Sequence, residues 1–186
     1  MREWITEEYG RWLEYGKENQ ELLQELLAMK EQEETIRDAF YKNLEFGTGG
    51  LRGVLGAGTN RMNVFTVAKA SQGLADYVNE KFSQEQRRIA VSYDSRIHSK
   101  DFAETAAQVF AANGIQVYIY DELMPTPCLS FAVRELKCVA GIMVTASHNP
   151  GEYNGYKVYW EDGAQITPPH DKNILAEVAK SMTMSR

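Results

Sequence analysis

Apolar residues in the first 45 positions recur at intervals of three and four, the spacing that places them on one face of a helix. This segment contains no proline and is rich in Glu, Gln, Leu and Lys. The repeating positions are Trp4, Ile5, Tyr9, Trp12 and Leu13, then Leu22, Leu23, Leu26 and Leu27, then Ile36, Phe40 and Leu44. The pattern predicts two or three amphipathic helices, which pack on the domain that follows or on a neighbour outside this sequence.

From residue 63 onward the pattern alternates between helices and strands. Apolar runs predict strands over 88–93, 115–119, 139–144 and 156–160, with an antiparallel partner for the last at 164–166. The helix starts follow from capping signals at Asn63, Ser99, Thr126-Pro127 and Thr167-Pro168. Strands that alternate with helices are typical of an α/β layer structure with a mostly parallel, mixed sheet. We expect a helical N-terminal extension over 1–45 and an α/β domain over 46–186.

Composition and charge narrow the functional classes. The 186 residues are 44% hydrophobic and 25% charged, as in a globular domain, and the formal net charge is −6. A negative net charge does not favour binding to nucleic acid or to an anionic membrane. No apolar run approaches the roughly 18 residues of a membrane span. Cys128 and Cys138 have no histidine neighbours that would suggest zinc. With no signal-peptide pattern at the N-terminus, we expect a cytoplasmic protein.

Ser147 follows the most apolar of the predicted strands. The run 139–144 is continuously apolar, as in a strand covered on both faces, and Thr145-Ala146-Ser147-His148-Asn149-Pro150 comes next. Ser147 is therefore expected just past the carboxyl end of a central strand, the edge at which open α/β sheets bind ligands. The residues alone leave two interpretations open: an ordinary Ser/Asn-Pro turn and a catalytic loop.

A glycine-rich segment precedes the α/β pattern. Six of the 14 glycines lie between Gly47 and Gly58. Such a backbone can approach an anion closely, but no Gly-Lys-Ser/Thr follows, and Arg52 stands where a dinucleotide-binding glycine would be, which disfavours ATP and NAD. The segment is either a flexible entry loop or a phosphate site, in which the Arg52 guanidinium fork would match a phosphate. Lys157, ten residues after Ser147, can fold back toward that serine.

Three motifs in order resemble those of the α-D-phosphohexomutases. They are Phe46-Gly47-Thr48-Gly49-Gly50-Leu51-Arg52-Gly53, Tyr93-Asp94-Ser95-Arg96, and the serine loop with Gly151-Glu152-Tyr153-Asn154-Gly155-Tyr156-Lys157-Val158. The helical N-terminal extension over 1–45, called the leader below, and Phe46 look most like the phosphoglucomutase and phosphopentomutase branch. The likeness begins near Leu44 and covers the first of the family's four domains, which implies a three-layer α/β/α fold.

The resemblance implies a phosphotransferase that interconverts glucose 1-phosphate and glucose 6-phosphate through glucose 1,6-bisphosphate. Ser147 would carry the phosphoryl group, and Mg²⁺ would bind one of its phosphate oxygens, with the other metal ligands on the second domain. The implied catalytic residues are Ser147, His148, Lys157 and Arg52, and the implied substrate-binding residues are Arg52, Thr48, Asn149 and Lys157. Domains two to four are absent from these residues, so we expect this chain alone to have essentially no mutase turnover.

Several alternatives remain open at this level. The sugar can be glucose, mannose or a pentose, so the domain fits a phosphoglucomutase, a phosphomannomutase, a phosphopentomutase or a glucose-1,6-bisphosphate synthase. His148 and Lys157 are both candidates for the general acid or base. A non-catalytic sugar-phosphate-binding module is a further possibility. A serine hydrolase is disfavoured, because the loop lacks a Gly-x-Ser-x-Gly elbow.

Overall fold

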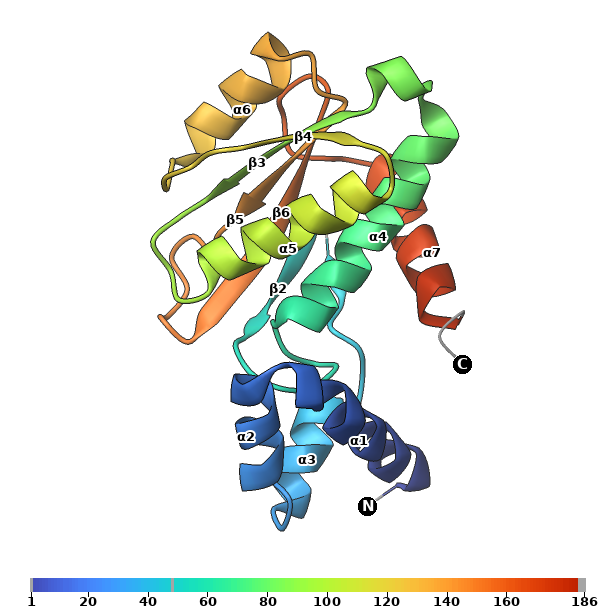
Figure 1. The fold of residues 1–186 in the computed structure, drawn as a ribbon, viewed down its shortest axis with the longest axis vertical. Coiled ribbons are helices and arrows are strands. Elements are labelled where there is room, and N and C mark those ends of the chain that lie inside the picture. The colour runs from blue at the N-terminus through green and yellow to red at the C-terminus, as the bar shows by residue number, and fades with distance from the viewer. Residues whose placement is uncertain (1, 48, 184–186) are drawn as a thin grey trace.

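Six strands form one sheet in the order β1-β2-β6-β5-β3-β4 (Figure 1). The computed structural model describes residues 2–47 and 49–183, with side chains up to residue 180. The elements are α1 (Glu3–Tyr15), η1 (Gly16–Glu18), α2 (Gln20–Ala28), α3 (Glu33–Phe40), β1 (Phe46–Gly47), β2 (Gly50–Val54), α4 (Val64–Lys81), η2 (Gln84–Gln86), β3 (Arg88–Tyr93), α5 (Ser99–Ala112), β4 (Gln116–Ile119), α6 (Thr126–Glu135), β5 (Ala140–Val144), β6 (Tyr153–Trp160) and α7 (His170–Thr183).

The sheet is mixed, as predicted. Strand β3 lies between β4 and β5 and is parallel to both, whereas β6, β2 and β1 continue the sheet through antiparallel pairings. All five residues of β5 are buried, which explains its continuous apolar run. Strand β6 begins at Tyr153, three residues before the predicted start at Tyr156. The predicted antiparallel partner at 164–166 is reduced to a single bridge between Tyr159 and Gln165.

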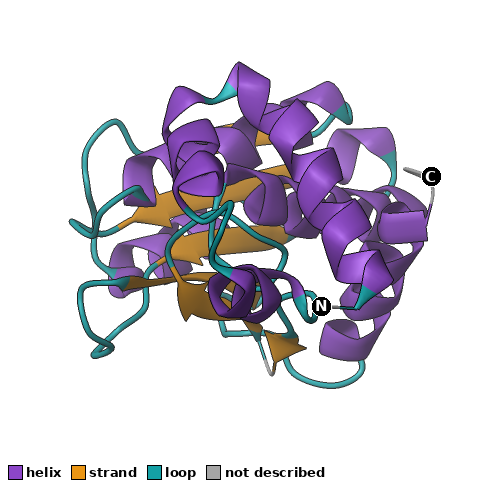
Figure 2. Ribbon diagram, turned by 90° about the horizontal axis from the view of Figure 1, so that it is seen from below, coloured by secondary structure: helices purple, strands orange, loops and turns teal. Residues whose placement is uncertain are grey.

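Helices cover both faces of the sheet, which gives the predicted three-layer α/β/α arrangement (Figure 2). Buried residues of α4, α5 and α7 form one large core with the sheet, and α6 packs on the opposite face around Leu129 and Val133. Burial of these apolar side chains on both faces holds the layers together. Among the described residues, no helix has the length and apolar content needed to cross a bilayer.

Local hydrogen bonds explain where the helices start. The Asn63 side chain accepts from the backbone of Phe65 and Thr66, and Thr66 Oγ1 accepts from Asn63 N, which is the capping box that begins α4 as predicted. The predicted start of α6 is displaced by one residue, because Pro125 is the cap and Thr126 is already helical. The predicted start of α7 at residues 167–168 is wrong, since the helix begins at His170. Two consecutive prolines precede it, and a residue followed by proline is disfavoured in the helical region.

The leader forms its own hydrophobic cluster and also packs on the domain. The Trp12 ring meets Phe40 of α3 at 5.6 Å and Phe65 of α4 at 5.4 Å, both edge to face. The predicted amphipathic helices are present. Their contact with α4 shows that they pack on the domain that follows, which is the first of the two predicted alternatives. Two residues of the predicted apolar stripes are exposed: Trp4 is 44% exposed and Leu27 is 53% exposed.

Candidate active site

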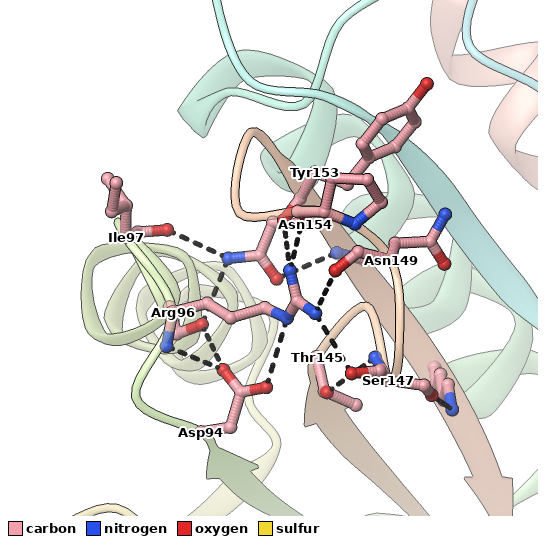
Figure 3. Close-up of polar contacts among 12 residues, drawn as sticks. Asp94, Arg96, Ile97, Thr145, Ser147, Asn149, Tyr153 and Asn154 are labelled. Atoms are coloured by element: carbon pink, nitrogen blue, oxygen red, sulfur yellow. Dashed lines mark hydrogen bonds and ion pairs between the residues drawn. The ribbon is translucent and has the colours of Figure 1, made fainter.

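Ser147 lies three residues past the end of β5, on the exposed surface of the loop (Figure 3). Its backbone is left-handed, with φ of 55°, and its N–H donates to Thr145 Oγ1 at 3.0 Å. Thr145 is buried and its own N–H donates to the Gly155 carbonyl of β6 at 3.1 Å. The loop is therefore tied to the sheet just before the serine, while Ser147 itself is exposed.

Lys157 approaches Ser147 from the neighbouring strand. Strand β6 runs antiparallel to β5 and pairs Lys157 with Met143, so the lysine returns to the edge at which Ser147 stands. Its Nζ donates to Ser147 Oγ at 2.6 Å, the approach that the sequence predicted. Partial burial lowers the pKa of the Lys157 ammonium below its ordinary value, and the nearby Arg52 guanidinium lowers it further, while Asp94 acts in the opposite direction. Lys157 is therefore placed to exchange a proton with the serine oxygen.

Arg52 comes from β2, on the other side of β6. The strand pairs Arg52 with Gly155, and the exposed guanidinium donates through Nη1 to Asn149 Oδ1 at 3.2 Å. Two of the predicted site residues, Arg52 and Lys157, thus contact the serine loop from the neighbouring strands, at Asn149 and at Ser147. No described carboxylate forms an ion pair with Arg52 or Lys157. Two cations without carboxylate partners leave this end of the site suited to an anion.

Within the described residues, the first half of the glycine-rich segment is a strand pair, which does not fit a flexible entry loop. Strands β1 and β2 form a short antiparallel hairpin, and β2 continues the sheet beside β6. Gly50 has φ of 151°, and a Cβ there would overlap the Tyr156 carbonyl oxygen of β6. The absence of a side chain at Gly50 therefore lets the backbones of β2 and β6 approach each other. This pairing also fixes the position of Arg52, two residues further along β2.

Arg96 holds the serine loop through its guanidinium group (Figure 3). Its guanidinium donates to the carbonyl oxygens of Ser147 at 2.9 Å, Asn149 at 2.6 Å, Pro150 at 2.9 Å and Tyr153 at 3.0 Å. The sequence marked the motif at 93–96 but assigned this arginine no role. The guanidinium has five N–H donors, so one arginine can bind several carbonyl oxygens at once.

Asp94 and Asn154 extend this support. Asp94 Oδ1 accepts from Arg96 N at 3.0 Å and from Ser99 Oγ at 2.7 Å, and its Oδ2 lies 3.6 Å from Arg96 Nε. The fully buried Asn154 donates through Nδ2 to Ile97 O and Ser99 Oγ, both at 3.0 Å. These bonds join the loop after β3 and the first residue of α5 to the start of β6, so the serine loop lies between two fixed segments.

The remaining predicted residues are less closely placed. His148 is exposed beside Ser147, and its imidazole makes no hydrogen bond or ion pair with the described residues. Thr48, predicted to bind substrate, lies outside the described residues. The structure therefore brings Ser147, Lys157, Arg52 and Asn149 together and leaves His148 adjacent to the serine in sequence only.

A cleft of about 630 Å³ opens beside this cluster. Arg52, Thr145 and Lys157 line it from the sheet, and Tyr41 and Lys42 line it from the chain just after α3. Its volume falls within the range of small-molecule sites. Within the described part of the chain, no group of three or more His, Cys, Asp or Glu side chains is arranged to hold a metal ion. Ser147 supplies one oxygen there, so the described residues do not by themselves form a Mg²⁺ site.

Comparisons with known proteins agree with these motifs. The family model described as "Phosphoglucomutase/phosphomannomutase, alpha/beta/alpha domain I" matches residues 43–184. The human phosphopentomutase is 42% identical over 187 residues, which cover 96% of this chain and 30% of that protein. The glucose 1,6-bisphosphate synthase of Mus musculus is 45% identical over 175 residues, 89% of this chain and 28% of that protein.

A solved structure shares the fold. A protein of Thermus thermophilus assigned as a phosphomannomutase superposes with a TM-score of 0.68 at 33% identity, over 74% of this chain and 30% of that one. The chain spans about 30% of the length of the relatives it matches. The family model, the close relatives and the solved structure agree that this chain belongs to the phosphoglucomutase/phosphomannomutase family, whose first α/β/α domain it contains.

Proposed function

We propose that this chain is the phosphoryl-carrying domain of a sugar phosphomutase, with Ser147 as the carrier. The observation that supports this most directly is the Lys157 ammonium, 2.6 Å from the Ser147 hydroxyl oxygen, with Arg52 beside the same loop. A serine phosphomonoester carries a charge of about −1.5 to −2. The two cations without carboxylate partners offset that charge, and the clamped loop keeps the phosphoryl group in one position.

In the forward transfer, the phosphoryl group passes from Ser147 Oγ to a free hydroxyl of the bound sugar monophosphate. The P–Oγ bond breaks with its electron pair going to Oγ, and a bond forms between phosphorus and the sugar oxygen. Lys157 Nζ donates its proton to Oγ, and the sugar hydroxyl loses its proton to the imidazole of the exposed His148, which follows Ser147 in the chain. The resulting sugar bisphosphate then returns its other phosphoryl group to Ser147: a P–Oγ bond forms as the bond between that phosphorus and its sugar oxygen breaks. The Ser147 hydroxyl proton goes back to Lys157, and the departing sugar oxygen takes the proton that His148 holds.

The electrostatics favour this cycle in both directions. A lowered pKa makes Lys157 a better proton donor to Oγ and leaves a larger fraction of neutral amine for the return step. Phosphoryl transfer passes through a loose transition state whose charge is spread over oxygens, so positioned cations supply most of the catalysis. In the complete enzyme we propose that Mg²⁺ binds the phosphoserine oxygen, with its other ligands outside this chain.

The relatives guide the choice of sugar. Those matching 96% of this chain are named phosphopentomutases, and others are named phosphoribomutase and glucose 1,6-bisphosphate synthase. We therefore propose pentose 1-phosphate and pentose 5-phosphate as the first substrates to assay. Glucose 1-phosphate and glucose 6-phosphate, with glucose 1,6-bisphosphate as intermediate, are the second pair.

A chimera tests the proposal. This chain replaces the matching segment of human phosphopentomutase, and turnover of pentose and glucose phosphates is measured. We expect an active chimera, essentially complete loss of turnover with Ser147→Ala, and little change with Ser95→Ala, which alters another exposed serine. Phosphopeptide mass spectrometry is expected to find the phosphoryl group on Ser147. An inactive chimera, or a Ser147→Ala chimera that keeps its turnover, would show the proposal to be wrong.

A further inference from the structure

The cleft beside Ser147 has two chemically different ends. At the sheet end, Arg52 and Lys157 have no ion-pair partner among the described carboxylates, which suits a phosphate. At the other end, the walls come from the last turn of α3, the segment after it and the turn at 58–61. The charges of that end are paired within the protein, so it offers little net attraction for a second anion.

We call this second end of the cleft, formed by the end of the N-terminal helical extension and the turn at 58–61, the leader end. Two ion pairs and an aromatic ring line it. Lys42 Nζ lies 3.0 Å from Glu45 Oε1, and the Arg61 guanidinium pairs closely with the Asp38 carboxylate. The Tyr41 side chain is 46% exposed, and the Lys42 ammonium lies 5.5 Å from the centre of its ring. Each pair places hydrogen-bond donors beside acceptors. A sugar hydroxyl both donates and accepts, so this surface matches hydroxyl groups better than it matches a phosphate.

The leader end is held rigidly against the domain. Thr59 Oγ1 donates to the Lys42 carbonyl at 2.7 Å, and Asn60 N donates to the Ala39 carbonyl at 2.9 Å. Gly58 has φ of 130°, and a Cβ there would come within 2.5 Å of the Ala39 carbonyl oxygen. Because the carbonyls of Ala39 and Lys42, on either side of Tyr41, both accept from this turn, the backbone at Tyr41 and Lys42 is held in position before any ligand binds.

We propose that Tyr41 and the Lys42–Glu45 pair form a subsite for the sugar part of a sugar phosphate whose phosphate lies on Arg52 and Lys157. This inference rests on the proposed function. The Tyr41 ring packs against the C–H face of the sugar, and the ion pair binds its hydroxyls. The family model begins at residue 43, so Tyr41 and Lys42 precede the shared domain. The leader thereby contributes to sugar selection at a site on the common phosphotransfer domain.

Two ligands separate the sugar contact from the phosphate contact. Amide chemical shifts of the ¹⁵N-labelled 186-residue chain are followed during titration with inorganic phosphate and with glucose 1-phosphate, and ribose 5-phosphate is added as a second sugar. We expect Tyr41→Ala to weaken glucose 1-phosphate binding about fivefold, the equivalent of about 1 kcal/mol for one aromatic contact, without changing the affinity for inorganic phosphate. Arg52→Ala is expected to weaken both. Tyr15→Ala is the matched control, because Tyr15 is also 46% exposed and belongs to the same leader.

Each outcome has a defined meaning. Unchanged glucose 1-phosphate affinity in Tyr41→Ala overturns the subsite, as does an equal loss of affinity for inorganic phosphate or an equal effect of Tyr15→Ala. In those cases, phosphate binding that still depends on Arg52 leaves the proposed function standing. Phosphate binding that is absent from the unaltered chain, or that survives Arg52→Ala unchanged, overturns the proposed function and the subsite with it.

Discussion

Replacing Arg96 with alanine is expected to release the loop that carries Ser147. The Arg96 side chain is only 15% exposed, and its guanidinium donates to four carbonyl oxygens between residues 147 and 153 (Figure 3). Alanine would leave those carbonyls without their donor. Water can replace the donor where the bonds are exposed, at Ser147 and Pro150, but less readily at Asn149 and Tyr153.

The size of the effect follows from the two partly buried bonds. A hydrogen bond to a charged group contributes about 1.5–3 kcal/mol, so two such bonds at the lower value give about 3 kcal/mol. The contact of Arg96 Nε with Asp94 Oδ2 at 3.6 Å is partly solvated and adds less than about 1 kcal/mol. We therefore expect Arg96→Ala to lower the free energy of unfolding by about 3–4 kcal/mol.

Urea denaturation followed by circular dichroism measures this loss. Arg11→Ala serves as the control, because Arg11 makes an ordinary exposed ion pair with Glu8 at 2.9 Å on α1 and its removal is expected to lower stability by about 0.5 kcal/mol or less. Amide hydrogen exchange in 147–153 should also accelerate in Arg96→Ala. A loss of less than about 1 kcal/mol for Arg96→Ala would refute the reasoning, since water would then satisfy these carbonyls as well as the guanidinium does.

Two further substitutions test the electrostatics and the strand packing. Because burial lowers the Lys157 pKa in the folded chain, the folded state binds this proton less tightly than the unfolded state. Lys157→Met should therefore raise the free energy of unfolding at pH 7. The gain should diminish as the pH rises from the lowered folded pKa toward the unfolded lysine value of about 10.4, and it should be lost above that value. A gain in urea denaturation that is the same at pH 7 and above that value would contradict this. Gly50→Ala should lower the free energy of unfolding by about 3 kcal/mol or more, because the new Cβ would overlap the Tyr156 carbonyl. Gly10→Ala, in open space on α1, should instead raise it by about 0.5–1 kcal/mol, and equal effects at the two glycines in thermal or urea denaturation would argue against the overlap.

Much of the site's position could be predicted from local sequence. A strand buried on both faces must be continuously apolar, so the run at 139–144 places Ser147 at the end of a central strand. Asn63 is recognisable as a cap because its side chain bonds to residues two and three positions ahead. Lys157 follows from the same logic, since a chain that leaves the loop as a neighbouring strand returns it to the serine.

Other parts of the site depend on distant contacts and could not be predicted in this way. The carbonyls that bind Arg96 are 51 to 57 positions away in the chain, so no local pattern marks its role. Strand β2 contains two glycines, a residue depleted in strands, and it is a strand because it pairs with β6 about 100 residues later. The leader's part in the cleft likewise arises from hydrogen bonds between α3 and the turn at 58–61.

The left-handed backbone of Ser147 costs stability at the position of the proposed carrier hydroxyl. Glycine and asparagine adopt this conformation more readily than serine does, so folding stability alone would favour one of them here. Neither residue has a hydroxyl that can accept a phosphoryl group. Serine at this turn therefore fits the proposed phosphoryl carrier, and Ser147→Gly is expected to relieve the backbone strain while removing the hydroxyl on which that proposal depends.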